Sequence, residues 1–266
     1  MFPLLQSQYA WGFVCGRVSG LEGQLLSPGF YTNLLAQEKL EEMLRLLQGL
    51  PLETTLVPGM QWDHWTDVVE RYYVNLLLSV RKDSPDPAVV DLFLMQGEYF
   101  NLKQALLKQM LRPFPKVLLS DEQLAAAHSG DYLTLPPFGK ALAARLRPGE
   151  RALETALPFE LQVDVAYLGH LLELAGATRA PLIEAYARQL VLGKAVLLLW
   201  RARRLGLPLA PYQQALQTIN VNHDLLAALA DAPEMNAWPV IAGGSLGQTL
   251  SAALEAPEHR QTAVFE

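Results

Sequence analysis

The sequence is poor in cysteine, in long apolar runs and in positive charge. Cys15 is the one cysteine among 266 residues, so no disulfide bond can form within the chain. The longest apolar stretch, Leu190–Trp200, has eleven residues and contains Lys194, which predicts a buried core helix and not a membrane span. The N-terminal residues also lack the basic segment and long apolar run of a secretory signal.

The charge balance argues against two classes of partner. Lysine and arginine number 21 and aspartate and glutamate 27, which gives a formal net charge of −6. A nucleic-acid surface needs clustered basic side chains to neutralise phosphates, and anchorage to anionic lipid needs them as well. Hydrophobic residues make up 51% of the chain, enough for a sizeable core in one elongated domain or in two or three small ones.

No stretch alternates apolar and polar residues between hairpin turns, so the sequence predicts an all-α protein. Connections are short, and neighbouring helices are therefore expected to be antiparallel. Ser27 and Ser120 are expected helix caps, and Gly97 is expected to separate two helices. The predicted helices cover residues 8–26, 28–35, 38–47, 63–80, 87–95, 99–112, 122–128, 138–147, 159–175, 182–205, 212–230 (as one helix or two) and 245–254. Residues 233–244 are expected to be irregular.

Two long apolar helices resemble each other, Tyr99–Arg112 and Tyr186–Arg203. Aligning Lys103 with Lys194, 91 residues later, also aligns a pair of leucines in each helix. Each helix ends in a basic residue followed by a proline-containing break. Similar helices at similar places in two blocks predict an internal repeat.

The first helix contains glycines at every fourth position, Gly12, Gly16 and Gly20. Each interior glycine costs about 1 kcal/mol relative to alanine. We expect close packing of another backbone along this side to offset that cost. Cys15, on the same helix, is expected to be buried and unreactive, because a reactive thiolate needs an electropositive, partly exposed environment.

The best candidate for a metal site is the cluster Asp63, His64 and Asp67. His64 and Asp67 are three residues apart and would share a helix face. A site still needs further ligands, for which Glu160 and Asp164 are distant candidates, and no second ligand pair at helical spacing occurs. Asp63 at a helix start is better explained as an N-cap.

Two glycine motifs and one basic cluster have structural explanations that we favour. The stretch 243–247 would offer free N–H groups to a phosphate, but no strand precedes it and the P-loop pattern is absent. The Gly193–Lys194 pair lacks the loop altogether. Arg201, Arg203 and Arg204 complement the dipole at a helix C-terminus, although they would also suit an acidic partner.

The residues from Tyr9 to about Leu207 resemble the C subunit of V/A-type rotary ATPases, the relatives of eukaryotic subunit d. Two patterns carry the resemblance, an opening Tyr-Ala helix with a Leu-Glu step and a Leu-Leu pair, and an Asn-Leu-Lys helix followed by Leu-Leu and a basic residue. The first pattern lies at Tyr9, Ala10, Arg17, Leu21, Glu22, Leu25 and Leu26, and the second at Asn101, Leu102, Lys103, Leu106, Leu107 and Lys108. In addition, the stretch 157–175 and the helix from Leu182 resemble the second of the family's three helical repeats, with Leu192–Gly193 in place of its Asn-Leu step. The chain departs from the family in being short after Pro211 and in lacking an Asn-Leu-Arg helix near its C-terminus.

The resemblance implies an elongated pseudosymmetric funnel of two to three helical repeats, at 1–115, 116–208 and, as an abbreviated third repeat or tail, 209–266. It implies a non-catalytic connector of the central stalk in a proton- or sodium-translocating enzyme complex. Its partners would be the rotor ring of the membrane sector and the central shaft subunits of the soluble sector. It would lie on the cytoplasmic face of the membrane, without a span of its own. No catalytic residue, cofactor or metal is expected.

Two alternatives remain open at this point. One is a helical metal-dependent enzyme that uses Asp63, His64 and Asp67. The other is a helical-repeat adaptor unrelated to rotary ATPases.

Overall fold

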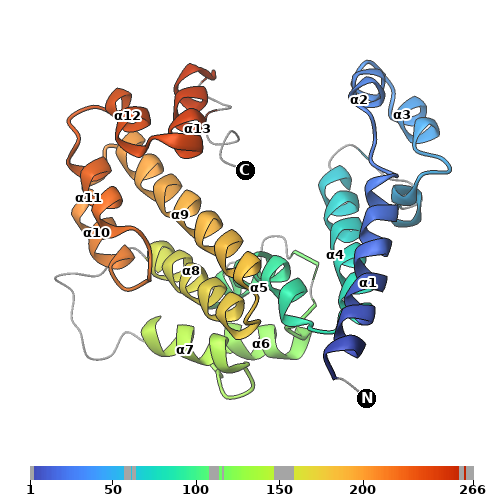
Figure 1. The fold of residues 1–266 in the computed structure, drawn as a ribbon, viewed down its shortest axis with the longest axis horizontal. Coiled ribbons are helices and arrows are strands. Elements are labelled where there is room, and N and C mark those ends of the chain that lie inside the picture. Colours follow the sequence, from blue (N-terminus) through green and yellow to red (C-terminus); the bar gives the residue numbers. More distant parts are fainter. Residues whose placement is uncertain are drawn as a thin grey trace. The chain divides into compact units, whose positions relative to one another are not determined.

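A computed structural model describes residues 3–56, 61, 64–107, 114–115, 117–146, 159–257 and 261. Throughout these ranges the regular elements are α-helices and short 3₁₀ helices, with no strand, which confirms the predicted all-α class (Figure 1). The chain divides into two compact units, Met1–His128 and Ser129–Glu266. The predicted repeats are a separate division of the chain and stay a prediction.

Unit 1 contains six α-helices among its described residues. Ser27 caps the second, where its Oγ accepts a hydrogen bond from the Phe30 N–H at 3.2 Å, as expected. Ser120 and Gln123 form a reciprocal capping box at the sixth, with distances of 3.1 and 2.9 Å. The elements are α1 (Pro3–Glu22), α2 (Pro28–Leu35), α3 (Leu40–Leu46), the 3₁₀ helix η1 (Pro51–Thr55), α4 (Trp65–Asp83), α5 (Ala88–Leu106) and α6 (Asp121–Ser129), whose last residue falls in unit 2.

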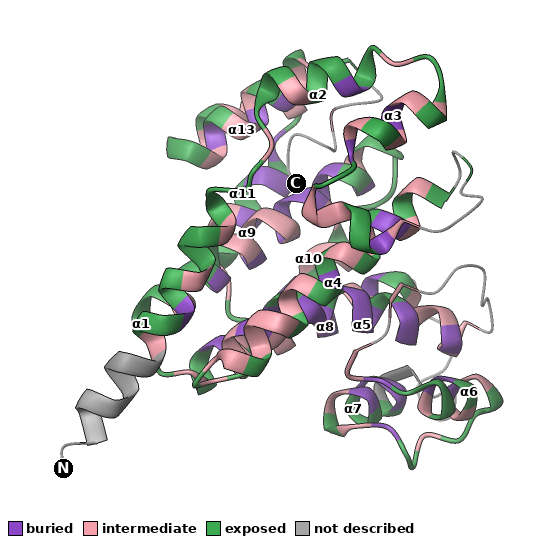
Figure 2. Ribbon diagram, turned by 90° about the vertical axis from the view of Figure 1, so that its right-hand side faces the viewer, coloured by how far each residue is buried: buried purple, intermediate pink, exposed green. Residues whose placement is uncertain are grey.

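Helix α5 supplies most of the core of unit 1. Ten of its 19 residues are buried, and they lie on several faces of the helix (Figure 2). An apolar helix that is buried nearly all round is typical of the centre of a helical protein. Helix α4 packs beside it, with Val68 and Val74 buried.

The predicted helix break at Gly97 is wrong, because α5 runs through it without interruption. A Cβ atom at this position would lie 2.3 Å from Cδ1 of Phe114. Gly97 is therefore explained by the ring of Phe114, which rests directly against the helix backbone. Sequence periodicity could not reveal this contact, because its partner lies 17 residues away in a connecting segment.

Unit 2 is built around α8 and α9, which pack against each other. The fully buried rings of Trp200 and Trp238 meet edge to face, with centroids 5.7 Å apart, and join α9 to the C-terminal helices. Its elements are α7 (Pro137–Leu146), α8 (Phe159–Ala177), α9 (Pro181–Arg204), α10 (Ala210–Leu216), α11 (His223–Asp231), the 3₁₀ helix η3 (Met235–Ala237), α12 (Trp238–Ala242) and α13 (Gly244–Glu255). The stretch expected to be irregular thus contains η3 and α12.

Each unit contains one hairpin of long helices. In the first, α4 and α5 have 19 residues each and are joined by the four residues 84–87. In the second, α8 has 19 residues and α9 has 24, with the three residues 178–180 between them. The second hairpin begins 94 residues after the first, since α4 starts at residue 65 and α8 at 159. This spacing is close to the predicted 91-residue offset.

The close approach of Phe114 yields a stability prediction. Replacing Gly97 with alanine should lower the free energy of unfolding by about 1–3 kcal/mol, since the new methyl group overlaps the ring. The control is Gly16→Ala in α1, where no described atom lies within 4 Å of the added Cβ. That variant should gain about 0.5–1 kcal/mol from helix propensity. Urea unfolding followed by circular dichroism measures both changes, and equal effects at the two positions would contradict the packing assignment.

Candidate functional site: polar clamps on α5

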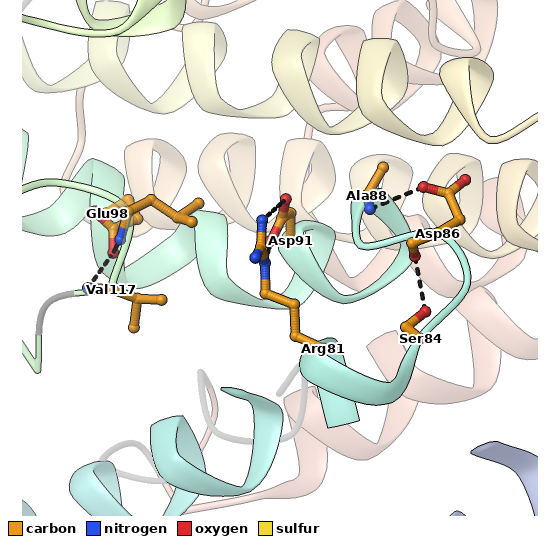
Figure 3. A network of polar contacts seen from close by, with 8 residues as sticks. Arg81, Ser84, Asp86, Ala88, Asp91, Glu98 and Val117 are labelled. Carbon is orange, nitrogen blue, oxygen red and sulfur yellow. Dashed lines mark hydrogen bonds and ion pairs between the residues drawn. The ribbon is translucent and has the colours of Figure 1, made fainter. Parts of the chain in front are cut away.

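A buried carboxylate holds the segment that follows α5. The side chain of Glu98 is 1% exposed and accepts three backbone hydrogen bonds. Its Oε1 atom accepts from the N–H group of Val117 at 3.0 Å (Figure 3). The same oxygen accepts from the Leu118 N–H at 3.1 Å, and Oε2 accepts from that of Leu119 at 2.9 Å. One side chain thus satisfies three consecutive N–H groups that lie outside any helix or strand.

Asn101, one helical turn further along α5, fastens the beginning of the same segment. Its Nδ2 donates to the carbonyl oxygen of Phe114 at 3.0 Å, and its Oδ1 accepts from the Phe114 N–H at 2.7 Å. The amide is 2% exposed, and both of its ends are paired with the same residue. Gly97, Glu98 and Asn101 lie on one side of α5, and together they fix the path from α5 to α6.

Burial raises the pKa of Glu98 above its ordinary value. The three backbone hydrogen bonds act in the opposite direction, and the carboxylate of Asp91 adds a smaller upward contribution. The three N–H donors stabilise the charged form of Glu98. The cost of removing that charge from water is larger than this stabilisation, so the net shift of the pKa is upward.

The turn of the α4–α5 hairpin is held by a second set of polar contacts. The guanidinium of Arg81 contacts the carboxylate of Asp91 through two parallel bonds, Nε to Oδ1 at 2.5 Å and Nη2 to Oδ2 at 3.1 Å (Figure 3). Asp86 accepts from the Ala88 N–H at 3.0 Å and so satisfies a donor at the start of α5, while the Ser84 hydroxyl donates to the Asp86 carbonyl at 2.8 Å. Bidentate geometry fixes the angle between the helices as well as their separation.

A third contact attaches α1 to the end of α4. Arg17 donates to the carboxylate of Asp83 and to the backbone carbonyl of Ser79, the latter at 2.8 Å. The two charged side chains are about one-third exposed, so the pair is worth on the order of 1 kcal/mol. Its main effect is to fix the orientation of α1.

The predicted metal cluster is only partly within the described residues. Asp63 lies outside them. His64 precedes α4, and its Nδ1 accepts from the Gln61 N–H at 3.3 Å, while Asp67 lies in the first turn of α4. Glu160 and Asp164 belong to α8 in unit 2. Wherever the structure gives side-chain positions, no three His, Cys, Asp or Glu residues are grouped closely enough to hold a metal ion.

The glycines of the stretch 243–247 form a turn and a helix-packing contact, as expected, whereas no described atom lies within 4 Å of a Cβ built at Gly193. Gly243 and Gly244 have positive φ angles of 62° and 52° and form the turn into α13. A Cβ at Gly247 would lie 2.4 Å from the carbonyl oxygen of Pro239, so this glycine allows α13 to pack on α12. Gly193 lies within α9, and the Nζ of Lys194 is 5.9 Å from the ring centroid of Tyr167, within the range of a cation–π contact.

Two expectations for α1 are wrong. Cys15 is exposed and not buried. Among the described residues nothing approaches within 4 Å of a Cβ built at Gly12, Gly16 or Gly20, so the expected close backbone packing is missing there. Arg201, Arg203 and Arg204 lie in the last turn of α9, as expected, and Arg203 also donates to the Ala232 carbonyl just after α11.

Sequence reasoning missed the clamp residues, although signals for two of them were present. Glu98 is a carboxylate in the middle of an apolar helix face, a position where an acidic residue is seldom found without partners. Asn101 belongs to the Asn-Leu-Lys pattern, and its role here is structural. The Arg81–Asp91 pair has no signal in the sequence, because its members are ten residues apart and meet only when the hairpin forms.

These features define an all-helical protein with a hairpin of long helices in each of two units. In the first unit, the buried side chains of Glu98 and Asn101 hold the segment that follows α5. No helix in the described ranges is both long and apolar enough to cross a membrane. The family model of the ATP synthase (C/AC39) subunit matches residues 14–266, and the chain belongs to this family. No individual characterised protein matched the chain.

The Glu98 clamp predicts a graded loss of stability on substitution. Glu98→Ala should lower the free energy of unfolding by about 3–5 kcal/mol, because one buried and two half-buried N–H groups lose their acceptor. Glu98→Gln keeps one acceptor oxygen and should cost about 1–2 kcal/mol. Exposed Glu38 provides the matched control, and its Ala and Gln variants should stay within about 0.5 kcal/mol of wild type.

Wild type and Glu98→Gln together test the direction of the pKa shift of Glu98. As pH rises through the ordinary carboxyl range, the unfolded chain loses the Glu98 proton first, whereas the folded chain holds it up to its higher pKa. Wild type should therefore lose stability relative to Glu98→Gln over this interval and then run parallel to it. A stability difference that grows with rising pH would show that the hydrogen bonds outweigh burial.

Proposed function

We propose that this chain is a non-catalytic connector in the central stalk of a V/A-type rotary ATPase that translocates protons or sodium ions. It joins the central shaft of the soluble sector to the rotor ring of the membrane sector and passes torque between them. The observation that carries the proposal is the family match over residues 14–266, which covers nearly the whole chain.

The construction of unit 1 suits a part that transmits force. Apolar contacts between helices are close-packed and resist deformation, although the hydrophobic effect itself is non-directional. Bidentate Arg81–Asp91 bonds and the Glu98 clamp are directional, so a small displacement breaks them. The Arg81–Asp91 bonds therefore resist shear within the hairpin, and the Glu98 bonds resist displacement of α5 from the segment 117–119.

A helical-repeat architecture is also consistent with this role. The long-helix hairpin recurs once in each unit, and we infer that each belongs to a repeat related by pseudosymmetry. The repeats would form a socket, with the segment 209–266 as the third, shortened member. The chain would act on the cytoplasmic face of the membrane as a peripheral subunit, and it needs no cofactor for this task.

Measuring ion transport and ATP hydrolysis side by side distinguishes a connector from a catalytic subunit. Inverted membrane vesicles prepared without this chain should show ATP-driven ion transport at background level, while the catalytic head retains ATP hydrolysis. Adding the purified chain should restore transport, and Glu38→Ala should restore it equally well. Glu98→Ala should restore less at a temperature where this destabilised variant is partly unfolded and wild type is still folded. Full transport in the absence of the chain would overturn the proposal.

A further inference from the structure

An open groove of about 560 Å³ lies within unit 1, between α1, η1, α4 and α5. Its walls are almost wholly apolar, with α1 contributing Trp11, Val14 and Val18 and the hairpin contributing Leu76 and Phe93. The lining residues of α1 run from Trp11 to beyond Leu21, and at 1.5 Å per residue they span more than about 15 Å. The groove is therefore elongated along the helix.

Helix α1 is rich in apolar residues, yet most of its described side chains are exposed or half-buried. Among the residues 11–22, Val14 is the one that is buried, whereas Val18 is 38% exposed. Figure 2 shows that most of the described part of α1 is exposed or intermediate. Leu25, just beyond the helix, lines the groove and is 78% exposed. Apolar side chains at positions 11, 14, 18, 21 and 25 repeat at intervals of three and four residues, which is the spacing of a helix–helix contact.

The groove carries a single charge. Glu22 is the one charged residue among those that line it, and its side chain is exposed. No described residue forms an ion pair with Glu22, and the nearest cation on α1, Arg17, is already bonded to Asp83. An acid at the end of an apolar groove selects a partner that places a basic side chain there.

We propose that this groove receives an α-helix of another subunit, which carries an aliphatic stripe with a Lys or Arg at the end that meets Glu22. The elongated form fits a helix laid beside α1, with anchor side chains at i, i+3 or i+4, and i+7. The inference rests on the proposed function, because the partner is a subunit of the same rotary complex. It adds to that function the surface and the chemistry of one contact.

Cys15 is a native reporter for this test, since it lines the groove, is exposed and is the chain's one cysteine. Its alkylation by iodoacetamide is followed by mass spectrometry of its peptide, in the isolated chain and in the detergent-solubilised ATPase complex. We expect alkylation in the complex to be at least about tenfold slower, because reactivity follows exposure. The control is Glu38→Cys in a Cys15→Ser background, an exposed position outside the groove that should react equally in both states.

The charge is tested separately. Purified chain is titrated into a complex depleted of it, and Glu22→Lys should bind at least about tenfold more weakly than wild type, with Glu22→Gln between them. Glu38→Lys should bind as wild type does. Equal binding by Glu22→Lys would overturn the assigned partner chemistry.

Three results would contradict the proposal that a helix of another subunit occupies the groove. If the chain joins the complex and Cys15 stays as reactive as in isolation, the groove is not the contact, although the proposed function survives. If the chain joins no such complex, both proposals fail together. Protection of Cys15 in the isolated chain, rising with its concentration or accompanied by a bound small molecule in native mass spectra, would assign the groove to a second copy or to an apolar ligand instead.

Discussion

The burial of one carboxylate, Glu98, is the constraint on which the connection between α5 and α6 depends. A charged group at 1% exposure is costly to desolvate, and it is stable there only because three N–H groups point at it. Those N–H groups in turn lie in a segment without helix or strand partners of its own. The carboxylate and the N–H groups thus satisfy each other, and the loss of either would leave the other without these hydrogen bonds.

The same face of α5 explains why Gly97 and Asn101 occur where they do. Asn101 pairs with both backbone groups of Phe114, and this brings the ring against the backbone at Gly97. At the other end of the helix, Arg81 and Asp91 hold the hairpin closed. Unit 1 is thus stabilised by directional contacts near the start and in the second half of its most buried helix.

Local signals in the sequence predicted most helices, because the 3.6-residue periodicity and the caps are properties of a few neighbouring residues. Ser27 and Ser120 are examples of caps that behave as expected. The failures involve contacts between distant residues, as at Gly97, or places where an expected neighbour is missing, as at Cys15 and Gly16 in α1. The clamp itself needed tertiary structure, since Glu98 and Leu119 are 21 residues apart.

The most direct test of the account is the set of partners that the chain has in its own cells. Tagged chain is recovered from gently solubilised membranes, and the proteins that accompany it are identified by mass spectrometry. The account predicts subunits of the ATPase shaft and head together with a small proteolipid of the rotor ring. Recovery of soluble proteins alone, with neither shaft nor proteolipid, would contradict it.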